Sequence, residues 1–315
     1  MHEKIKMGIS SCLLGEKVRY DGGNKLDRFI TNTLGQYFEC VQVCPECEYG
    51  LPIPREPLHL VGRPESPRLI TIKTGIDHTE KMLRWAEKKL GELAQKNLCG
   101  FIFKSKSPSS GIGGVKVHTP SGIPSQRGVG IFGGAFMKRF PLTPVIDDGR
   151  LHNPQLRENF IESVFVFQRW QKLQKSGGIN DLVWFHTSHK LLMLAHSPKH
   201  YSALGRLVAG AKRVKQETLF SAYLKGFMEG MRLLATPKKN ANVLLHIAEY
   251  FKKLISSDEK QELLEVIENY RTGLIPLIIP ITLVKHYVRK YTVTYLQKQY
   301  YLNPHPMELM LRNHV

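Results

Sequence analysis

The first half of the chain is best interpreted from residues 6–15, Lys-Met-Gly-Ile-Ser-Ser-Cys-Leu-Leu-Gly, in which a short apolar run leads into a polar turn with a cysteine. Lys6–Ser10 predicts a β-strand, and Phe38–Val43 and Gly100–Lys104 predict two more. Between the second and third strands, Thr79 is the expected N-cap of a helix with Met82, Leu83, Ala86, Leu90 and Leu93 on one face. This alternation predicts an α/β domain with a mostly parallel sheet at about residues 1–150.

The pattern changes near Asn153, after which helical periodicity dominates. We expect a linking helix within residues 151–179 that ends at Gly177-Gly178, followed by an all-α domain at 180–315. The amphipathic stretches are Leu156–Lys175, Asp181–Ala195, Tyr201–Leu234, Val243–Ser256, Glu259–Tyr270 and Pro280–Tyr301. The segment Gly111–Gly134 is rich in Gly, Ser and Pro, which predicts a mobile loop.

Length and composition agree with a folded protein of two domains. The chain has 315 residues, 42% of them hydrophobic and 23% charged, which excludes a disordered chain. Its longest apolar run, residues 273–284, is interrupted by Pro276 and Pro280 and is shorter than the roughly 18 residues of a membrane span. No signal-peptide pattern opens the chain. We therefore expect a cytoplasmic protein that does not cross a membrane.

Positive charge is concentrated in the second half. Residues 166–315 contain 22 Lys and Arg against 10 Asp and Glu, a balance of +12, and the remaining +6 of the total +18 lies in residues 1–165. Such a field attracts polyanions, either nucleic acid or an anionic membrane surface.

Three polar clusters directly follow the three predicted strands. They are Ser10-Ser-Cys12, Cys44-Pro-Glu46-Cys47 and Lys104-Ser-Lys-Ser107-Pro-Ser-Ser110. Ligands of open parallel sheets bind beyond the carboxyl ends of the strands, so we expect these clusters to meet in one site. The five cysteines are odd in number and all lie in the first third, which favours reduced thiols or ligands of zinc or an iron–sulfur cluster over a disulfide framework.

These motifs resemble the TudS-type thiouracil desulfidases, through Ser11-Cys12-Leu-Leu-Gly, Val43-Cys44-Pro-Glu46 and Lys104-Ser-Lys-Ser107-Pro-Ser-Ser110-Gly111. The second half resembles a helical YbgA-type domain, through Phe185-His186-Thr-Ser-His189-Lys190, Asn242-Val-Leu-Leu-His246 and Tyr301-Leu-Asn-Pro-His-Pro-Met-Glu-Leu. Fusions of this kind are similar to tRNA 4-thiouridine desulfidases. The resemblance implies a [4Fe-4S] cluster and an enzyme that replaces a thiocarbonyl sulfur with oxygen.

The resemblance also implies roles for individual residues. Cys12 and Cys44 match two cluster ligands, and Glu46 and Ser107 match the catalytic carboxylate and hydroxyl. Where the family usually has a third cysteine, this chain has Ser110, and a serine alkoxide is a poor ligand for iron. Three alternatives follow: Cys47 becomes the third ligand, the cluster is weakly held, or the domain is inactive.

Two arginines belong to the same motifs. Arg19 and Arg55 are each predicted either to clamp a phosphate or a base, or to form a structural ion pair with a neighbouring acid. The implied reaction is non-redox: an open iron polarises the thiocarbonyl sulfur, water adds to the ring carbon and hydrosulfide leaves. Glu46 moves the protons, and Ser107 holds the ring or the water.

The basic half is predicted to hold tRNA by contacts with phosphates. The expected RNA-binding residues are Lys116, Arg127, Lys212, Arg213, Lys215, Lys238 and Lys239. His186, His189 and His196 are interpreted as packing histidines, and Phe160, Phe165, Phe167 and Trp170 as core rather than as a base-stacking platform. Two other functions stay open: a tRNA-binding protein with an inactive desulfidase domain, and a desulfidase of free thiouracil.

Overall fold

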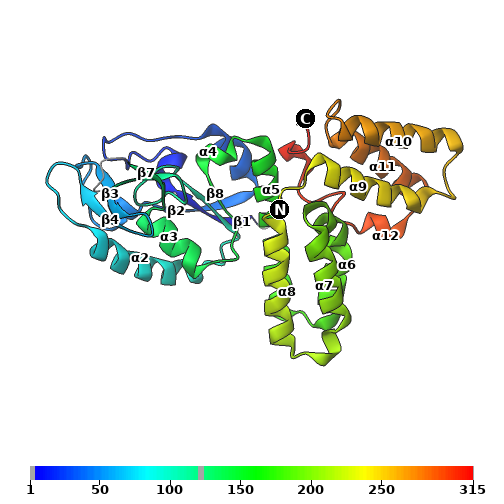
Figure 1. The fold of residues 1–315 in the computed structure, drawn as a ribbon, viewed down its shortest axis with the longest axis horizontal. Coiled ribbons are helices and arrows are strands. Elements are labelled where there is room, and N and C mark those ends of the chain that lie inside the picture. The colour runs from blue at the N-terminus through cyan, green and yellow to red at the C-terminus, as the bar shows by residue number, and fades with distance from the viewer. Residues whose placement is uncertain (1–3, 120–123, 315) are drawn as a thin grey trace. The chain divides into compact units, whose positions relative to one another are not determined.

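A computed structural model describes residues 4–119 and 124–314. The chain divides into two compact units, Met1–Asn153 and Pro154–Val315 (Figure 1). The first unit contains all the described strands, and the second is helical. The predicted fold class, an α/β domain with a parallel sheet followed by an all-α domain, is confirmed.

The first sheet of the N-terminal unit is entirely parallel, with strand order β2-β1-β5-β8. Its members are β1 (Ile5–Ser10), β2 (Phe38–Val43), β5 (Gly100–Phe103) and β8 (Val145–Asp147). The three strands predicted from the sequence therefore lie side by side in one sheet, with β1 between β2 and β5. All their carboxyl ends point to the same edge.

A second sheet, with strand order β4-β3-β6-β7, was not predicted. It contains β3 (Leu58–Arg63), β4 (Ser66–Thr71), β6 (Val115–His118) and β7 (Ser125–Gly128). The prediction of a structureless loop over Gly111–Gly134 is wrong for the described part, because this segment supplies β6, β7 and the start of α3 (Ile131–Arg139). Its residues 120–123 lie outside the described residues. Pairing with β3, which is distant in the sequence, stabilises β6 despite the glycine-rich composition.

Two helices cover the parallel sheet. The α2 helix (Thr79–Ala94) packs against α3 (Figure 1). Both helices contact a cluster of aromatic rings that includes Phe101 and Phe103 on β5. A β-carbon on Gly8 of β1 would lie 2.1 Å from the Phe101 ring, so only glycine fits there. Two details of the predicted helix differ. Leu83 is 46% exposed, and Thr79 is the first helical residue rather than the N-cap, with its hydroxyl bonded to Asp77 and to Leu69 N–H.

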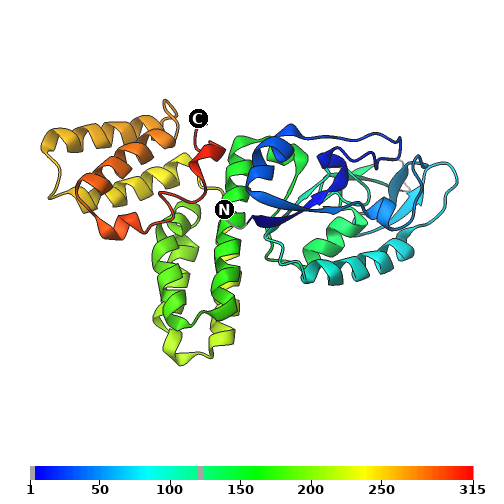
Figure 2. The ribbon, with the colours of Figure 1, turned by 180° about the vertical axis from the view of Figure 1, so that it is seen from behind.

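The C-terminal unit consists of eight described helices and short turns. In both views α6, α7 and α8 run beside one another, and α9, α10 and α11 pack together (Figures 1 and 2). Their bounds are α5 Pro154–Ser176, α6 Ile179–His196, α7 Pro198–Ala209, α8 Gln216–Met231, α9 Pro237–Ala248, α10 Ser257–Arg271, α11 Ile278–Lys290 and α12 Thr294–Gln297. The single stretch predicted at Tyr201–Leu234 is two helices, since the chain turns after Gly210 through a 3-10 turn at Ala211–Arg213.

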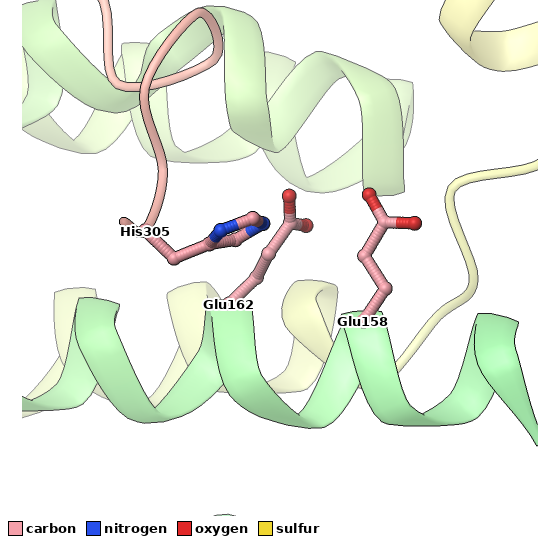
Figure 3. A group of neighbouring side chains, drawn as sticks. All are labelled: Glu158, Glu162 and His305. Atoms are coloured by element: carbon pink, nitrogen blue, oxygen red, sulfur yellow. The ribbon is translucent and has the colours of Figure 1, made fainter. Parts of the chain in front are cut away.

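A buried ion network holds the C-terminal segment to α5. Arg312, 5% exposed, donates to Glu162 Oε1 at 2.7 Å and to Glu158 Oε1 at 3.2 Å. Figure 3 shows both carboxylates on α5 with the His305 ring beside Glu162. Potential ligand atoms of Glu158, Glu162 and His305 lie within 4.8 Å of one another, as in a metal site. Because the Arg312 guanidinium already donates to both carboxylates and His314 also contacts Glu158, we interpret the group as structural.

The histidines of α6 are packing residues, as predicted. His189 is fully buried between the rings of Phe185 and Tyr300, and His196 bonds Glu162 and the Leu233 carbonyl. Burial holds the pKa of His189 well below its usual range, so its ring is neutral at pH 7. None of the described helices combines the length and the apolar composition needed to cross a bilayer.

Candidate active site

One cavity of about 440 Å³ lies beyond the carboxyl ends of β1, β2 and β5. It brings together the three clusters that the sequence predicted to meet, because parallel strands end at a common edge. Its lining includes Ser10, Ser11, Cys12, Val18, Arg19, Tyr20, Lys25, Val43, Cys44, Pro45, Glu46, Arg55, Pro57, Leu58 and Lys104–Ser110. The site is thus formed by loops that follow strands of one sheet.

The loop after β5 is fixed by the start of α3. The first amide groups of this helix donate to loop carbonyls, with Phe132 N–H 2.8 Å from Ser109 O. This approach requires small residues, since a β-carbon on Gly130 would lie 2.6 Å from the Ser109 carbonyl carbon and one on Gly133 would lie 2.7 Å from the Ser110 oxygen. Ser109 and Ser110 are buried at 1% and 4% exposure. The loop is therefore held in place by the first turn of α3.

Glu46 connects the polar contacts of the cavity, to Arg55 and to Ser109. It lies on the short helix α1 (Pro45–Glu48), which starts directly after Cys44. One carboxylate oxygen pairs with the Arg55 guanidinium, and the other accepts a hydrogen bond of 2.7 Å from the Ser109 hydroxyl. The Ser107 hydroxyl lies 3.0 Å from that of Ser109 and accepts the Ser110 amide at 3.1 Å. Ser107, Ser109 and Glu46 thus form one chain of proton-carrying groups.

The cysteines differ in their relation to the cavity. Cys12 and Cys44 line it, whereas Cys47 is not among the lining residues and its thiol donates to the Val18 carbonyl at 3.4 Å. Ser110 occupies the cavity wall instead. Among the described residues, no three cysteine sulfurs lie within 4.8 Å of one another, which disfavours a single metal ion. Two thiols that line one cavity, with a third on the adjacent short helix α1, are donors of the kind that hold an iron–sulfur cluster.

Burial keeps these thiols protonated in the absence of a metal. Desolvation raises the pKa of Cys12 to about 11, partly offset by Lys104 and Arg19, and raises the pKa of Cys44 to about 12. A metal cation bound to the sulfurs lowers the pKa values of the thiols and displaces their protons. The basic lining residues favour the negative charge that the thiolates then carry.

The basic side chains at the cavity have different partners. Arg55 pairs with Glu46 and not with the adjacent Glu56, it donates to Val18 O at 2.8 Å, and its Nε–H has no hydrogen-bond partner among the described residues. Arg19 forms a longer ion pair of 3.4 Å with exposed Asp21. Sequence analysis gave no role to Ser109, which contacts Glu46, or to Asp148, which holds Lys104 Nζ at 2.8 Å. Only the family motif includes Ser109, and no local pattern indicates Asp148.

The residues predicted to bind RNA lie outside this cavity. Lys239 is half-buried and donates to the carbonyls of His196 and Leu234, so it stabilises the end of α6. The other members are exposed, namely Lys116, Arg127, Lys212, Arg213, Lys215 and Lys238. Their role in RNA binding stays a prediction.

Known proteins match the two units separately. Residues 7–148 match the family described as 2-thiouracil desulfurase, and residues 190–306 match a family described as a protein of unknown function (DUF1722). The uncharacterized protein YbgA of Escherichia coli K12 is 31% identical over 152 residues, covering 48% of this chain and 90% of YbgA. The uncharacterized protein YbbK of Bacillus subtilis 168 is 33% identical over 119 residues, covering 36% of this chain and 78% of YbbK.

One solved structure is also similar, that of the [4Fe-4S]-dependent thiouracil desulfidase TudS. It is 31% identical, and the match covers 48% of this chain and 95% of that chain with a TM-score of 0.39.

Proposed function

The chain belongs to the 2-thiouracil desulfurase family through residues 7–148 and to the DUF1722 family through residues 190–306, and from this premise we propose that it is a non-redox desulfidase of tRNA. The proposed reaction converts 4-thiouridine to uridine and releases sulfide. The observation that supports it is the cavity itself, in which two thiols, a carboxylate and a chain of serine hydroxyls meet.

Cys12 and Cys44 are the proposed ligands of a [4Fe-4S] cluster, with Cys47 as the third. When bound, such a cluster supplies a Lewis-acidic iron for the sulfur of the thiocarbonyl group. Cys47 is suited to join the set because its sulfur lies next to Arg55, 3.6 Å from Nη1, on the same short helix as Glu46. Ser110 lines the cavity but offers iron only a hydroxyl.

Glu46 is the proposed proton-transfer group. Its carboxylate accepts a proton from the water that adds to the ring carbon. The carbon–sulfur bond then breaks and hydrosulfide leaves, without oxidation or reduction of the substrate. The pair with Arg55 fixes the carboxylate, and the Ser109 and Ser107 hydroxyls provide a path along which the proton can be passed to the departing group or to solvent. Arg19 and Lys25 line the cavity and supply the positive charge that attracts a nucleotide phosphate.

tRNA is the proposed substrate because the +12 balance of residues 166–315 favours a polyanion over a free base. The test is anaerobic reconstitution of the full chain with iron and sulfide, followed by incubation with 4-thiouridine-containing tRNA. We expect a brown protein with about four irons and a loss of the 4-thiouridine absorbance. Desulfidation of free 2-thiouracil but not of tRNA would contradict the substrate assignment.

Ser110 is a specific reason to consider a binding protein that has lost its chemistry. A colourless protein that still retards tRNA at low salt would support that second function. The iron content of the reconstituted variants Cys47→Ser and Ser110→Cys identifies the third ligand. If Cys47 is the ligand, Cys47→Ser loses iron while Ser110→Cys leaves the iron content unchanged.

A further inference from the structure

The helical unit has an open groove that the proposed chemistry does not use. It has a volume of about 580 Å³ and lies between one side of α6 and residues 294–299, which include α12. The lining residues are Asn180, Val183, Trp184, Thr187, Ser188, Thr294, Tyr295, Lys298 and Gln299. None of these is acidic.

Two aromatic side chains line the groove. Trp184 is 53% exposed, and its ring is held edge-on by Tyr300 at a centroid distance of 6.3 Å. Tyr295 is stacked on Tyr250 at 5.1 Å with an interplanar angle of 15°. An exposed tryptophan fixed by a neighbouring ring is an unusual feature of a surface helix, because most large apolar side chains of this unit are buried.

The groove also contains a buried polar atom without a partner. Gln299 is only 2% exposed, and its Nε2 donates to the Thr187 carbonyl at 2.8 Å. Its Oε1 has no hydrogen-bond partner among residues 4–119 and 124–314. An unsatisfied buried carbonyl costs free energy, so a ligand with an N–H donor in the groove stabilises this arrangement. Nucleobases carry such donors at their edges.

The charge around the aromatic rings is positive. Lys298 lines the groove, is exposed and makes no ion pair with any described residue. Lys190 Nζ lies 5.3 Å from the centre of the Tyr295 ring. Aromatic faces next to lysines, with no carboxylate in the lining, match the requirements of a single strand of nucleic acid, whose bases stack while its phosphates seek cations.

We propose that this groove binds an unstacked base of a single-stranded RNA segment, with Trp184 as the stacking surface, Gln299 Oε1 as acceptor for a base N–H, and Lys298 as phosphate contact. The inference rests on the proposed tRNA function and adds a base-binding site distinct from the lysines expected from the sequence. Single-stranded loops and ends are the parts of tRNA that offer unstacked bases.

The test is fluorescence anisotropy of a short labelled oligouridine with the full chain. Trp184→Ala is expected to weaken binding about tenfold, because stacking is lost, with no change in the slope of affinity against salt. Lys298→Gln is expected to lower that slope by about one. Trp184→Phe keeps an aromatic face and is expected to retain most of the affinity, which separates stacking from misfolding.

Matched controls lie outside the groove. Leu274→Ala, at 72% exposure, and Lys225→Gln, also exposed, are expected to leave binding unchanged. Wild-type affinity in Trp184→Ala, or an equal loss toward an RNA duplex, would overturn the inference. Desulfidation of free 2-thiouracil depends on the proposed reaction and not on the groove. Loss of that activity and loss of RNA affinity are therefore measured separately.

Discussion

The two units each bury a polar network, and the networks differ in what they leave unsatisfied. In the helical unit, Arg312 donates to both Glu158 and Glu162. In the N-terminal unit, Glu46 is bonded on both sides, but the buried thiol of Cys12 and the half-buried thiol of Cys44 line a cavity whose volume is sufficient for a ligand. A network whose charged groups are bonded to one another stabilises a fold, whereas a network with thiols at a cavity can perform chemistry.

The largest expected difference between the networks concerns Glu46. Glu46→Gln removes the proton acceptor while keeping the shape of the side chain, so desulfidation is expected to fall by about 10²–10⁴. The rate of loss of 4-thiouridine measures it. Glu39→Gln, at an exposed position of β2, is the control and is expected to be as active as the wild type. An active Glu46→Gln enzyme would remove the distinction drawn between the two networks.

The network of the helical unit is expected to control stability instead. Arg312→Met leaves the buried carboxylate of Glu162 and the half-buried one of Glu158 without the guanidinium that bonds both, and the expected cost is about 3–5 kcal/mol of unfolding free energy. Urea denaturation followed by circular dichroism measures it. The matched variant Arg271→Met breaks an exposed pair with Glu268 and is expected to change stability little. Equal losses of unfolding free energy in the two variants would show that the buried ion pairs stabilise the fold no more than an exposed one.

A smaller effect tests whether Ser109 belongs to the catalytic network. Ser109→Ala removes the hydrogen bond to Glu46 Oε1 and is expected to reduce desulfidation about tenfold, as for loss of one bond to a charged group. A wild-type rate in Ser109→Ala would exclude the Ser109 hydroxyl from the catalytic network. Ser125→Ala, on β7, is the serine control.

The smallest effect concerns the pH dependence of the helical unit. The folded pKa of His189 lies well below 6.5, so below pH 6.5 the unfolded chain binds a proton that the folded chain does not. Stability is therefore expected to decrease as the pH falls from 6.5, by at most about 1.4 kcal/mol per pH unit. His189→Gln is expected to reduce this slope, whereas exposed His246→Gln is not. Thermal unfolding between pH 7 and pH 5 measures both.

Much of the organisation could be predicted from the sequence because it depends on local patterns. The three strands, the change to helices and the meeting of three clusters at one sheet edge follow from periodicity and from the geometry of parallel sheets. The second sheet could not be predicted in this way. Its strand β6 lies in a glycine-rich segment and is stabilised by a partner far away in the chain.

By itself, the sequence determined which reactive groups are available: the thiols of Cys12 and Cys44, the carboxylate of Glu46 and the excess of lysine and arginine. Tertiary structure decided their states. Arg55 pairs with Glu46 rather than with Glu56, Cys47 turns toward Val18, and Gln299 is buried against Thr187. Such pairings depend on distances between residues separated along the chain, which local spacing does not specify. Burial then sets the pKa values and leaves the free donors and acceptors that a ligand can use.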